Sequence, residues 1–412
     1  MNVVGLVVEY NPLHNGHRYH FEQAKKMSKA EACVIVMSGN FLQRGEPAIV
    51  DKWARTRMAL QMGVDLVFEL PYVYSTQHAN WFAFGAVALL NQLPFVTHLC
   101  FGSESGELEA LDKLADVIVH EPDRLKQTLQ AKLKEGWPFP KAYSYALQAV
   151  IQHDDNLAET IKQPNNILGL HYLAALKRLK SGIIPLTLKR YKAHYHQESF
   201  ADSHIASATS IRQALLERDV PHWDEVRPYV PHYTLDGLIK EYEAGRGLVH
   251  WETFYSYLAH LLLSQSASQL RQIYEMEEGI EHRLKKYILQ ADSLNHLIQL
   301  VKTKRYTHNR IQRMLVHLLT QCRKDEIRSL NLEKGPTYLR LLGYSSRGKR
   351  LLNQYKHRLN VPLIASIKKE HPAMLELDLK AAAIYNLGIY PNEPGLAQLR
   401  EFSQPPLFIE SD

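Results

Sequence analysis

Continuous apolar runs alternate with amphipathic stretches along the first half of the chain. The runs lack the polar–apolar alternation of half-exposed strands, which is typical of strands buried on both faces of a sheet. They cover residues 3–8, 32–37, 64–70, 95–101 and 184–190. The intervals carry helical periodicity, clearest at 16–27 and 77–93, and Asp51 is placed to cap a further helix. This order predicts an α/β fold with a doubly wound parallel sheet.

Residues 107–179 interrupt this alternation, and we interpret them as a helical insertion before the fifth strand. Helices are predicted there at 107–119, 123–135, 141–153 and 166–179. Three prolines and several aromatic residues at 219–234 indicate a stiff linker, which makes 1–218 the first domain. Residues 235–412 are predicted to be mainly helical, with segments near 235–245, 250–265, 278–291, 293–304 and 307–322. Two later apolar runs, 338–344 and 361–367, are compatible with short strands.

The turn after the first strand carries the pattern His14-x-Gly16-His17. Free N–H groups and the positive dipole end of a helix attract phosphate, and Gly16 lets a ligand approach the backbone. Two imidazoles at such a helix start can stabilise charge that builds up on phosphoryl oxygens. The four-residue pattern is weak by itself, but its place in a βα unit favours nucleotidyl transfer, with His14 and His17 as catalytic residues.

Other candidate residues also lie at the ends of predicted strands. Loops at 11–17, 38–46, 71–75 and 102–106 share the carboxyl edge of the sheet, where such folds bind ligands. A second phosphate loop is predicted from Ser207, Thr209, Ser210 and Arg212, which open a helix reaching about residue 218. An ordinary Ser/Thr cap is the alternative explanation of the hydroxyls, but their pairing with the His14-x-Gly16-His17 pattern makes the phosphate loop the more specific one. A cap also explains one of the asparagines at 165 and 166.

The net charge of +6 is unevenly distributed. Residues 301–358 hold fifteen Lys and Arg against three acids, so the rest of the chain is net acidic. On the predicted helix at 307–322, Arg310, Arg313 and His317 share one face. Tyrosines nearby favour a nucleic-acid surface over a merely solvated basic face. The candidate RNA-binding residues are Lys304, Arg305, Arg310 and Arg313.

Several classes of protein are disfavoured. The three cysteines are isolated, the chain opens without a leader pattern, and no apolar run has membrane-spanning length, so we expect a cytoplasmic protein. Neither a P-loop nor a dinucleotide fingerprint is present. A zinc site formed by His14, His17 and His20, with His194 and His196, competes with the phosphate site, but no carboxylate or thiolate has matching spacing. We therefore expect no protein-bound metal, and Mg²⁺ only as the counter-ion of ATP.

Five stretches of the sequence carry a more specific resemblance. Residues 5–17, 37–47, 101–104 and 164–169, and in the helical half 303–319, are similar to the bacterial tRNA(Met) cytidine acetate ligase family of the HxGH nucleotidyltransferase superfamily. The resemblance implies a Rossmann-like (HUP) catalytic domain and a tRNA-binding helical domain. The chain departs from the superfamily at Ala206 and Ala208, where a serine-rich loop is usual. This departure leaves the contacts of the second phosphate loop open.

The resemblance also implies an activity. Acetate and ATP would form acetyl-adenylate, and the acetyl group would pass to N4 of the wobble cytidine, position 34, of elongator tRNA(Met). The implied ATP site comprises Val7, Val8, Glu9, Tyr10, Asn11, Pro12, Leu13, His14, Asn15, Gly16, His17, Arg18, Tyr19, His20, Gly102, Asn165 or Asn166, and Arg190. Two alternatives remain, namely a small-molecule adenylyltransferase and a non-catalytic RNA-binding protein.

Overall fold

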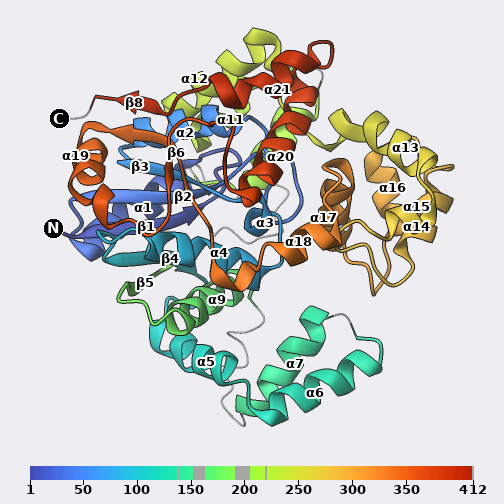
Figure 1. Ribbon diagram of the computed structural model, residues 1–412, viewed down its shortest axis with the longest axis horizontal. Helices are drawn as coiled ribbons and strands as arrows, with labels where there is room; N and C mark the ends of the chain where they lie inside the picture. The colour runs from blue at the N-terminus through green and yellow to red at the C-terminus, as the bar shows by residue number, and fades with distance from the viewer. Residues whose placement is uncertain (138, 152–162, 191–204, 219, 411–412) are drawn as a thin grey trace.

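The computed structural model describes residues 1–137, 139–151, 163–190, 205–218 and 220–410 (Figure 1). Its centre is a sheet whose strands are β1 (Val3–Val8), β2 (Ala32–Ser38), β3 (Leu66–Leu70), β4 (His98–Ser103), β5 (Ile184–Lys189), β6 (Leu339–Ser345), β7 (Leu363–Ile364) and β8 (Leu407–Ile409). The order is β5-β4-β1-β2-β3-β6-β7, and β8 also pairs with β6. The first five strands are parallel, so all five predicted strands are confirmed.

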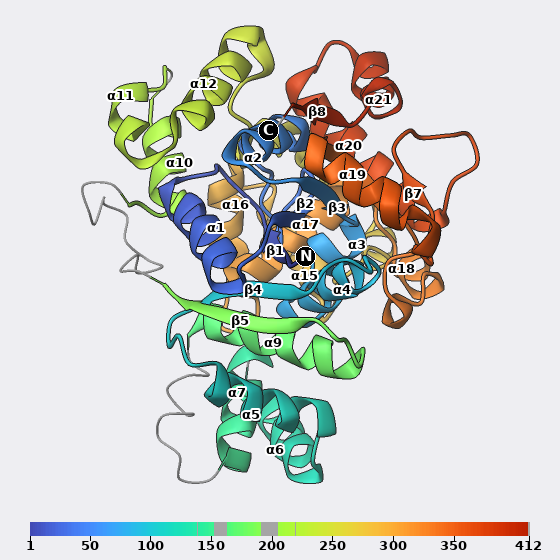
Figure 2. The same cartoon turned by 90° about the vertical axis from the view of Figure 1, so that its left-hand side faces the viewer.

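Helices cover both faces of this sheet, as a doubly wound fold requires. Alternate residues of each strand enter two separate apolar cores, because successive side chains of a strand point to opposite faces. Leu6 and Ile35 pack under α1 (Asn15–Ser28) and α2 (Lys52–Met62), together with α10 (Ala208–Leu216) and α12 (His232–Glu241). Val34 and Val36 face α4 (Ala79–Asn91) and α9 (Pro164–Arg178) on the other side (Figure 2).

Helices occupy the described part of the chain between β4 and β5, where a helical insertion is predicted. Its described helices are α5 (Leu108–His120), α6 (Asp123–Lys134), α7 (Phe139–Ile151) and α9. Helix α5 packs along α9, while α6 and α7 pair with each other below the sheet (Figures 1 and 2). The amphipathic pattern of α5, with Leu111, Leu114, Ala115 and Ile118 buried, accounts for this packing.

The chain beyond residue 218 is more than a helical appendage. Its helices are α11 (Trp223–Val226), α12, α13 (Tyr255–Ser264), α14 (Ala267–Leu270), α15 (Ile280–Tyr287), α16 (Leu294–Val301), α17 (His308–Leu319), α18 (Lys324–Ser329), α19 (Ser346–Tyr355), α20 (Ala373–Ile389) and α21 (Pro394–Ser403). Strand β6 lies antiparallel to β3, so the prediction of a purely parallel sheet is wrong at this edge. The predicted linker therefore does not end the sheet.

A buried ion cluster joins the first and last parts of the chain. Lys52 Nζ on α2 lies 2.7 Å from Glu69 Oε2 on β3 and 2.8 Å from Glu401 Oε2 on α21. All three side chains are at most 5% exposed. Charges removed from water are tolerated only when they are paired and hydrogen-bonded, so the three groups depend on one another. Asp51 caps α2 as predicted, accepting from the Ala54 N–H at 2.8 Å.

Candidate nucleotide-binding site

A cavity of about 560 Å³ opens at the carboxyl ends of β1, β4 and β5. Strands β1 and β4 are neighbours although they are far apart in sequence, which makes their ends the switch point where such sheets bind ligands. Three of the four predicted strand-end loops contribute to the cavity. The loop at 71–75 is wrong as a site prediction, because it forms the buried helix α3 (Tyr72–Ser75). Ala79 and Phe82 of α4 line the cavity in its place.

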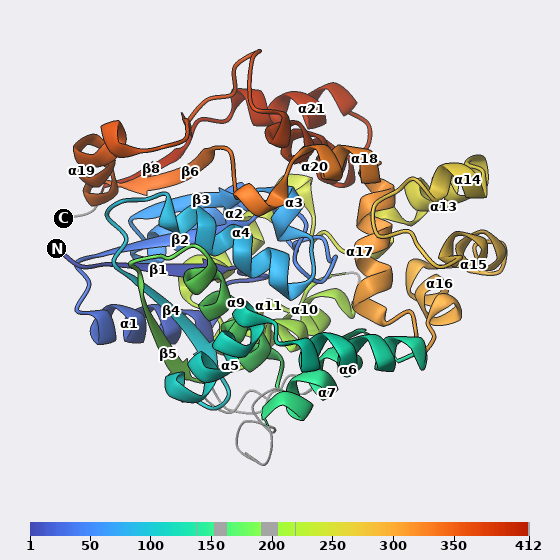
Figure 3. The same cartoon turned by 60° about the horizontal axis from the view of Figure 1, so that its bottom comes forward.

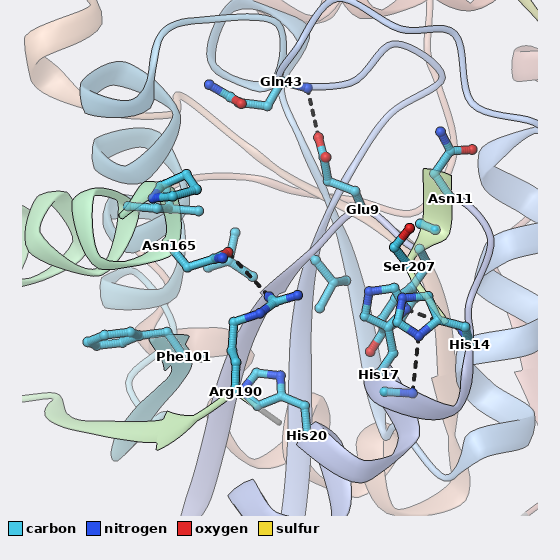
Figure 4. A pocket seen from close by; sticks show the side chains of 18 of the residues that line it. Glu9, Asn11, His14, His17, His20, Gln43, Phe101, Asn165, Arg190 and Ser207 are labelled. Carbon is cyan, nitrogen blue, oxygen red and sulfur yellow. Dashed lines mark hydrogen bonds between the residues drawn. The ribbon is translucent and has the colours of Figure 1, made fainter. Parts of the chain in front are cut away.

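His14 and His17 lie together at the start of α1 (Figure 4). His14 Nδ1 accepts from the Gly16 N–H at 3.1 Å, and His17 Nδ1 accepts from the His14 N–H at 3.3 Å. In a neutral imidazole whose Nδ1 is an acceptor, the proton resides on Nε2. Each histidine is therefore fixed in the tautomer that offers an Nε2–H donor, which is the arrangement that a developing phosphoryl charge needs.

These histidines are neutral near pH 7. Burial, followed by the charges of Arg190 and Arg212, lowers the pKa of His14 to about 3. Burial also lowers the pKa of His17 well below its usual value and that of His20 to about 4. His20 Nε2 is buried without a hydrogen-bond partner among the described residues. The histidines thus serve as neutral donors, while the arginines supply the positive charge.

Two predicted arginines reach the cavity. Arg190 donates from Nη1 to Asn165 Oδ1 at 3.2 Å, and a Cβ at Gly102 would lie 3.2 Å from its Cγ. Arg212 donates from Nη1 to the Asn11 carbonyl and from Nη2 to Glu46 Oε2, both at 2.8 Å. The second arginine is therefore held beside the histidines by an acidic partner.

The two candidate asparagines have different positions. Asn165 lines the cavity, and its Nδ2 donates to Glu104 Oε1 at 2.6 Å. Asn166 is 2% exposed, and its Oδ1 accepts from the Glu104 N–H at 2.8 Å, which ties α9 to the loop after β4. Asn165 is thus the one placed to touch a ligand, whereas Asn166 holds the loop.

The second predicted phosphate loop is only partly in the cavity. Ser207 and Thr209 line it, but Ser210 does not. Ser207 caps α10 by accepting from the Ser210 N–H at 3.1 Å, and Ser210 is 3% exposed. The ordinary capping role therefore accounts for the Ser207–Ser210 pair, and the assignment of Ser210 to the phosphate loop is corrected.

Four residues of the implied stretch 7–20 lie outside the cavity lining, for simple reasons of helix and core geometry. Pro12 is buried, and Leu13 is 0% exposed in the core. Asn15 donates to the Pro228 carbonyl at 2.9 Å, and Arg18 pairs with Glu22 on the outer face of α1. Other residues of the stretch line the cavity: Val7, Val8, Glu9, Tyr10, Asn11, His14, Gly16, His17, Tyr19 and His20.

Sequence reasoning missed much of the wall. Leu42, Gln43, Arg44 and Glu46 line the cavity from the loop after β2, where only the loop as a whole was predicted. Asn309, at the start of α17, lines it from the second half of the chain, and no local pattern could have placed it there.

The predicted basic face of α17 is wrong. Arg313 donates from Nε to both oxygens of Glu275 at 3.0 and 3.1 Å, and its side chain is 13% exposed. Arg310 Nη1 lies 3.2 Å from Glu278 Oε2. His317 is 1% exposed, and its Nδ1 lies 2.8 Å from the Tyr72 hydroxyl. The helix is packed between the sheet domain and the α13–α16 helices (Figure 3). Arg313 and His317 therefore meet an acid and the core, while Arg310 is partly exposed and paired with Glu278.

The wider basic tract is also divided. Lys304 and Arg305 are exposed just before α17, whereas Arg340 is 1% exposed on β6. Lys349 and Arg350 are exposed on α19, which lies at the opposite side of the molecule from α17 (Figures 1 and 3). The antiparallel direction of β6 causes this separation, because it carries the chain to the edge of the sheet remote from the cavity.

Within the part of the chain that the structure describes, no group of three or more His, Cys, Asp or Glu is arranged to hold a metal ion. His194 and His196 lie outside the described residues. In the same described part, no helix has both the length and the apolar character needed to span a membrane.

Comparison with known proteins agrees with this geometry. Residues 1–397 match the HIGH Nucleotidyl Transferase family. The tRNA(Met) cytidine acetate ligases of Acetivibrio thermocellus and Anoxybacillus flavithermus are 42% and 43% identical to the chain, over 98% and 99% of it and 99% and 100% of their own lengths. The chain belongs to this ligase family. The resemblance stated from the sequence is confirmed.

Solved structures give the same result for the fold. This chain resembles two crystal structures of Thermotoga maritima TmcAL, one in the apo state and one bound with alpha-thio ATP. The TM-scores are 0.92 and 0.91, at 34% identity and with 100% of both chains covered. The predicted fold class is therefore confirmed, apart from the antiparallel edge described above.

Proposed function

We propose that this protein is an ATP-dependent ligase that activates acetate as acetyl-adenylate and acetylates N4 of the wobble cytidine of elongator tRNA(Met). The observation that carries the proposal is the convergence of two Nε2–H donors, from His14 and His17, with Arg190 and Arg212 in one cavity. A crystal structure of a related protein is described as bound with alpha-thio ATP, which supports the assignment of this cavity to ATP.

The chemistry follows from these groups. An acetate oxygen attacks the α-phosphorus, a mixed anhydride forms, and pyrophosphate leaves with the electron pair of the broken P–O bond. The two imidazoles act where negative charge grows on the α-phosphoryl oxygens, because fixed donors in a site that excludes water stabilise such charge strongly. Mg²⁺ would arrive with ATP, held mainly by phosphate oxygens and water. No covalent intermediate with the protein is needed.

The ATP contacts are proposed from the cavity lining. Gly102 and Asn165 would hold the nucleoside end, since Gly102 leaves the backbone open and Asn165 is anchored through Glu104. Arg190, which donates to Asn165 and whose charge acts on His14, would lie between this end and the phosphates. Arg212, with Ser207 and Thr209 nearby, would hold the leaving pyrophosphate. The proposed partners are acetate and elongator tRNA(Met), and the proposed location is the cytoplasm. Lys304 and Arg305 are the exposed residues of the predicted tRNA set.

One set of assays tests the proposal. Purified protein is given ATP, Mg²⁺ and acetate, and acetate-dependent exchange between ATP and pyrophosphate is measured first without tRNA. Labelled acetate is then followed into tRNA(Met) and into a tRNA without a wobble cytidine. Exchange that requires a different acid, or that needs no acceptor acid, would favour a small-molecule adenylyltransferase. RNA binding without exchange would favour a non-catalytic RNA-binding protein.

A further inference from the structure

Glu9 follows β1 and lines the cavity, and only one of its two carboxylate oxygens accepts a hydrogen bond from the described residues. Its Oε1 accepts from the Gln43 N–H at 2.7 Å and from the Ser38 hydroxyl at 3.4 Å. No described residue donates a hydrogen bond to Oε2. Figure 4 shows this carboxylate directed toward Gln43 and away from Arg190 and His20. Glu9 is partly exposed and lines the cavity, so this oxygen is open to a ligand that supplies an N–H.

The space beside Glu9 is enclosed by the loop after β2 and by helices α4 and α17. Gln43 Nε2 donates to the Gln77 carbonyl at 2.9 Å, just before the start of α4, from which Ala79 and Phe82 line the cavity. In the same turn, a Cβ at Gly45 would lie 2.3 Å from the Arg313 backbone nitrogen on α17. One helical turn earlier on α17, the exposed Asn309 lines the cavity. The Glu9 side of the cavity thus borders the second half of the chain.

Charge separates this side from the phosphate side. Arg190 and the histidines lie at one end, and the Glu9 carboxylate is directed toward the other. Arg212, whose charge acts on His14, is itself paired with Glu46. A carboxylate repels a triphosphate and attracts an N–H donor. Leu42 and Phe82 add apolar surface, which suits the face of a flat ring. The Glu9 side therefore fits a neutral, planar heterocycle that carries an amino group.

We propose that the Glu9 side of the cavity is the subsite for the acceptor nucleobase, and that Glu9 Oε2 takes the proton from its exocyclic amine. This inference rests on the proposed function. The amine nitrogen bonds to the acetyl carbon of acetyl-adenylate, and the bond between that carbon and the phosphate oxygen breaks. The electron pair leaves with AMP, and the proton of the amine passes to Glu9 and then to solvent.

The surroundings of Glu9 favour this role. Burial raises the pKa of Glu9 above its usual value, and the nearby Glu46 acts in the same direction. The Gln43 hydrogen bond, Arg44 and Arg55 oppose the rise. Burial, followed by the charge of Glu9, raises the pKa of Tyr172 on α9. A carboxylate with a raised pKa is a better proton acceptor at neutral pH than an exposed one.

The test is Glu9→Gln, measured separately in the two half-reactions. Glutamine keeps an Oε1 that can accept from the Gln43 N–H but has no basic oxygen. We expect acetyl transfer from acetyl-adenylate to tRNA(Met) in a single turnover to fall by about 10²-fold more than ATP–pyrophosphate exchange, the scale of a lost general base. The wild-type transfer rate should rise with pH as Glu9 ionises, and the variant should lack this rise.

A matched control is Glu46→Gln. It also removes one carboxylate charge from the cavity wall, but it breaks the ion pair with Arg212. It should lower exchange and transfer together.

The Glu9 assignment is overturned if Glu9→Gln leaves acetyl transfer unchanged. It is also overturned if the variant lowers both half-reactions equally and raises the Michaelis constant for ATP, because adenine would then lie beside Glu9. A wild-type protein that exchanges pyrophosphate but never acetylates tRNA would refute the proposed acceptor, and the nucleobase subsite with it. Circular dichroism and thermal unfolding of both variants establish that the fold is intact.

Discussion

The imidazole rings of His14 and His17 are stacked, with centroids 3.8 Å apart and planes 27° from parallel. Stacking and the two backbone donors to Nδ1 leave each ring little freedom, so both Nε2–H groups keep fixed positions in the cavity. A donor that is already oriented has no reorganisation to undergo when charge appears on the α-phosphate. The spacing of three positions between His14 and His17 thus holds both Nε2–H donors in one fixed arrangement.

His17→Ala should lower acetate-dependent ATP–pyrophosphate exchange by about 10²-fold or more, the usual scale for removing one transition-state donor. The fold should survive, because His17 lies in the cavity wall at a helix start and belongs to neither apolar core. His17→Gln serves as the comparison, since its amide N–H reaches about as far as Nε2–H and should retain part of the rate. Exchange near the wild-type rate in His17→Ala would exclude His17 from the chemistry.

Arg212→Ala should reduce turnover more than it weakens ATP binding, because a contact to the leaving pyrophosphate strengthens as charge moves onto it. The Arg212 ion pair with Glu46 adds a second expectation. Removing Arg212 leaves that carboxylate unpaired, whereas Arg212→Lys keeps a charge and should retain more activity. Steady-state kinetics with varied ATP decide the matter. A rise in the Michaelis constant alone would mean that Arg212 binds only the ground state.

His171 provides a pH test away from the proposed chemistry. Burial, followed by His78 and Arg178, lowers its pKa from the usual 6.5 to about 3. Below pH 6.5 the unfolded chain therefore binds a proton that the folded chain does not, so stability falls as the pH drops from 6.5 toward 3. One such group contributes a slope of up to about 1.4 kcal/mol per pH unit. His171→Phe should flatten the dependence of unfolding free energy on pH over this range, as measured by urea unfolding. An unchanged slope would show that His171 does not contribute.

The βα order of the first half could be predicted because each buried strand is a continuous apolar run and each turn carries strong breakers. An apolar run indicated a short strand at β6, but its partner could not be predicted. The pairing of β6 with β3 spans some 270 residues, and no local sequence pattern records such a pairing. The error on α17 has a similar cause. Helical spacing does put Arg310, Arg313 and His317 together, but it cannot show that Glu275, Glu278 and Tyr72 will meet them.

Lys52→Met tests whether the two halves of the chain unfold together. It would leave Glu69 and Glu401 buried side by side without their cation. Breaking such a cluster from one side costs about 3–5 kcal/mol. We expect a single, strongly lowered transition in chemical unfolding. Lys113→Met, on α5, removes a lysine whose ion pair with Glu109 is largely exposed, and it should leave the midpoint unchanged. Two separate transitions would indicate that α21 detaches independently of the sheet.

Lys304 and Arg305 remain the exposed members of the predicted tRNA-binding set, and they precede the helix that reaches the cavity through Asn309. Replacing both with Ala should weaken tRNA binding and reduce the slope of log affinity against log salt by roughly 0.7–0.9 for each lost phosphate contact. Acetyl-adenylate formation without tRNA should not change. The matched control replaces Lys349 and Arg350, an equally exposed basic pair on α19 at the far side of the molecule. If the control pair lowers affinity as much as the first pair, binding reflects overall charge, and the anticodon arm is not guided by the region before α17.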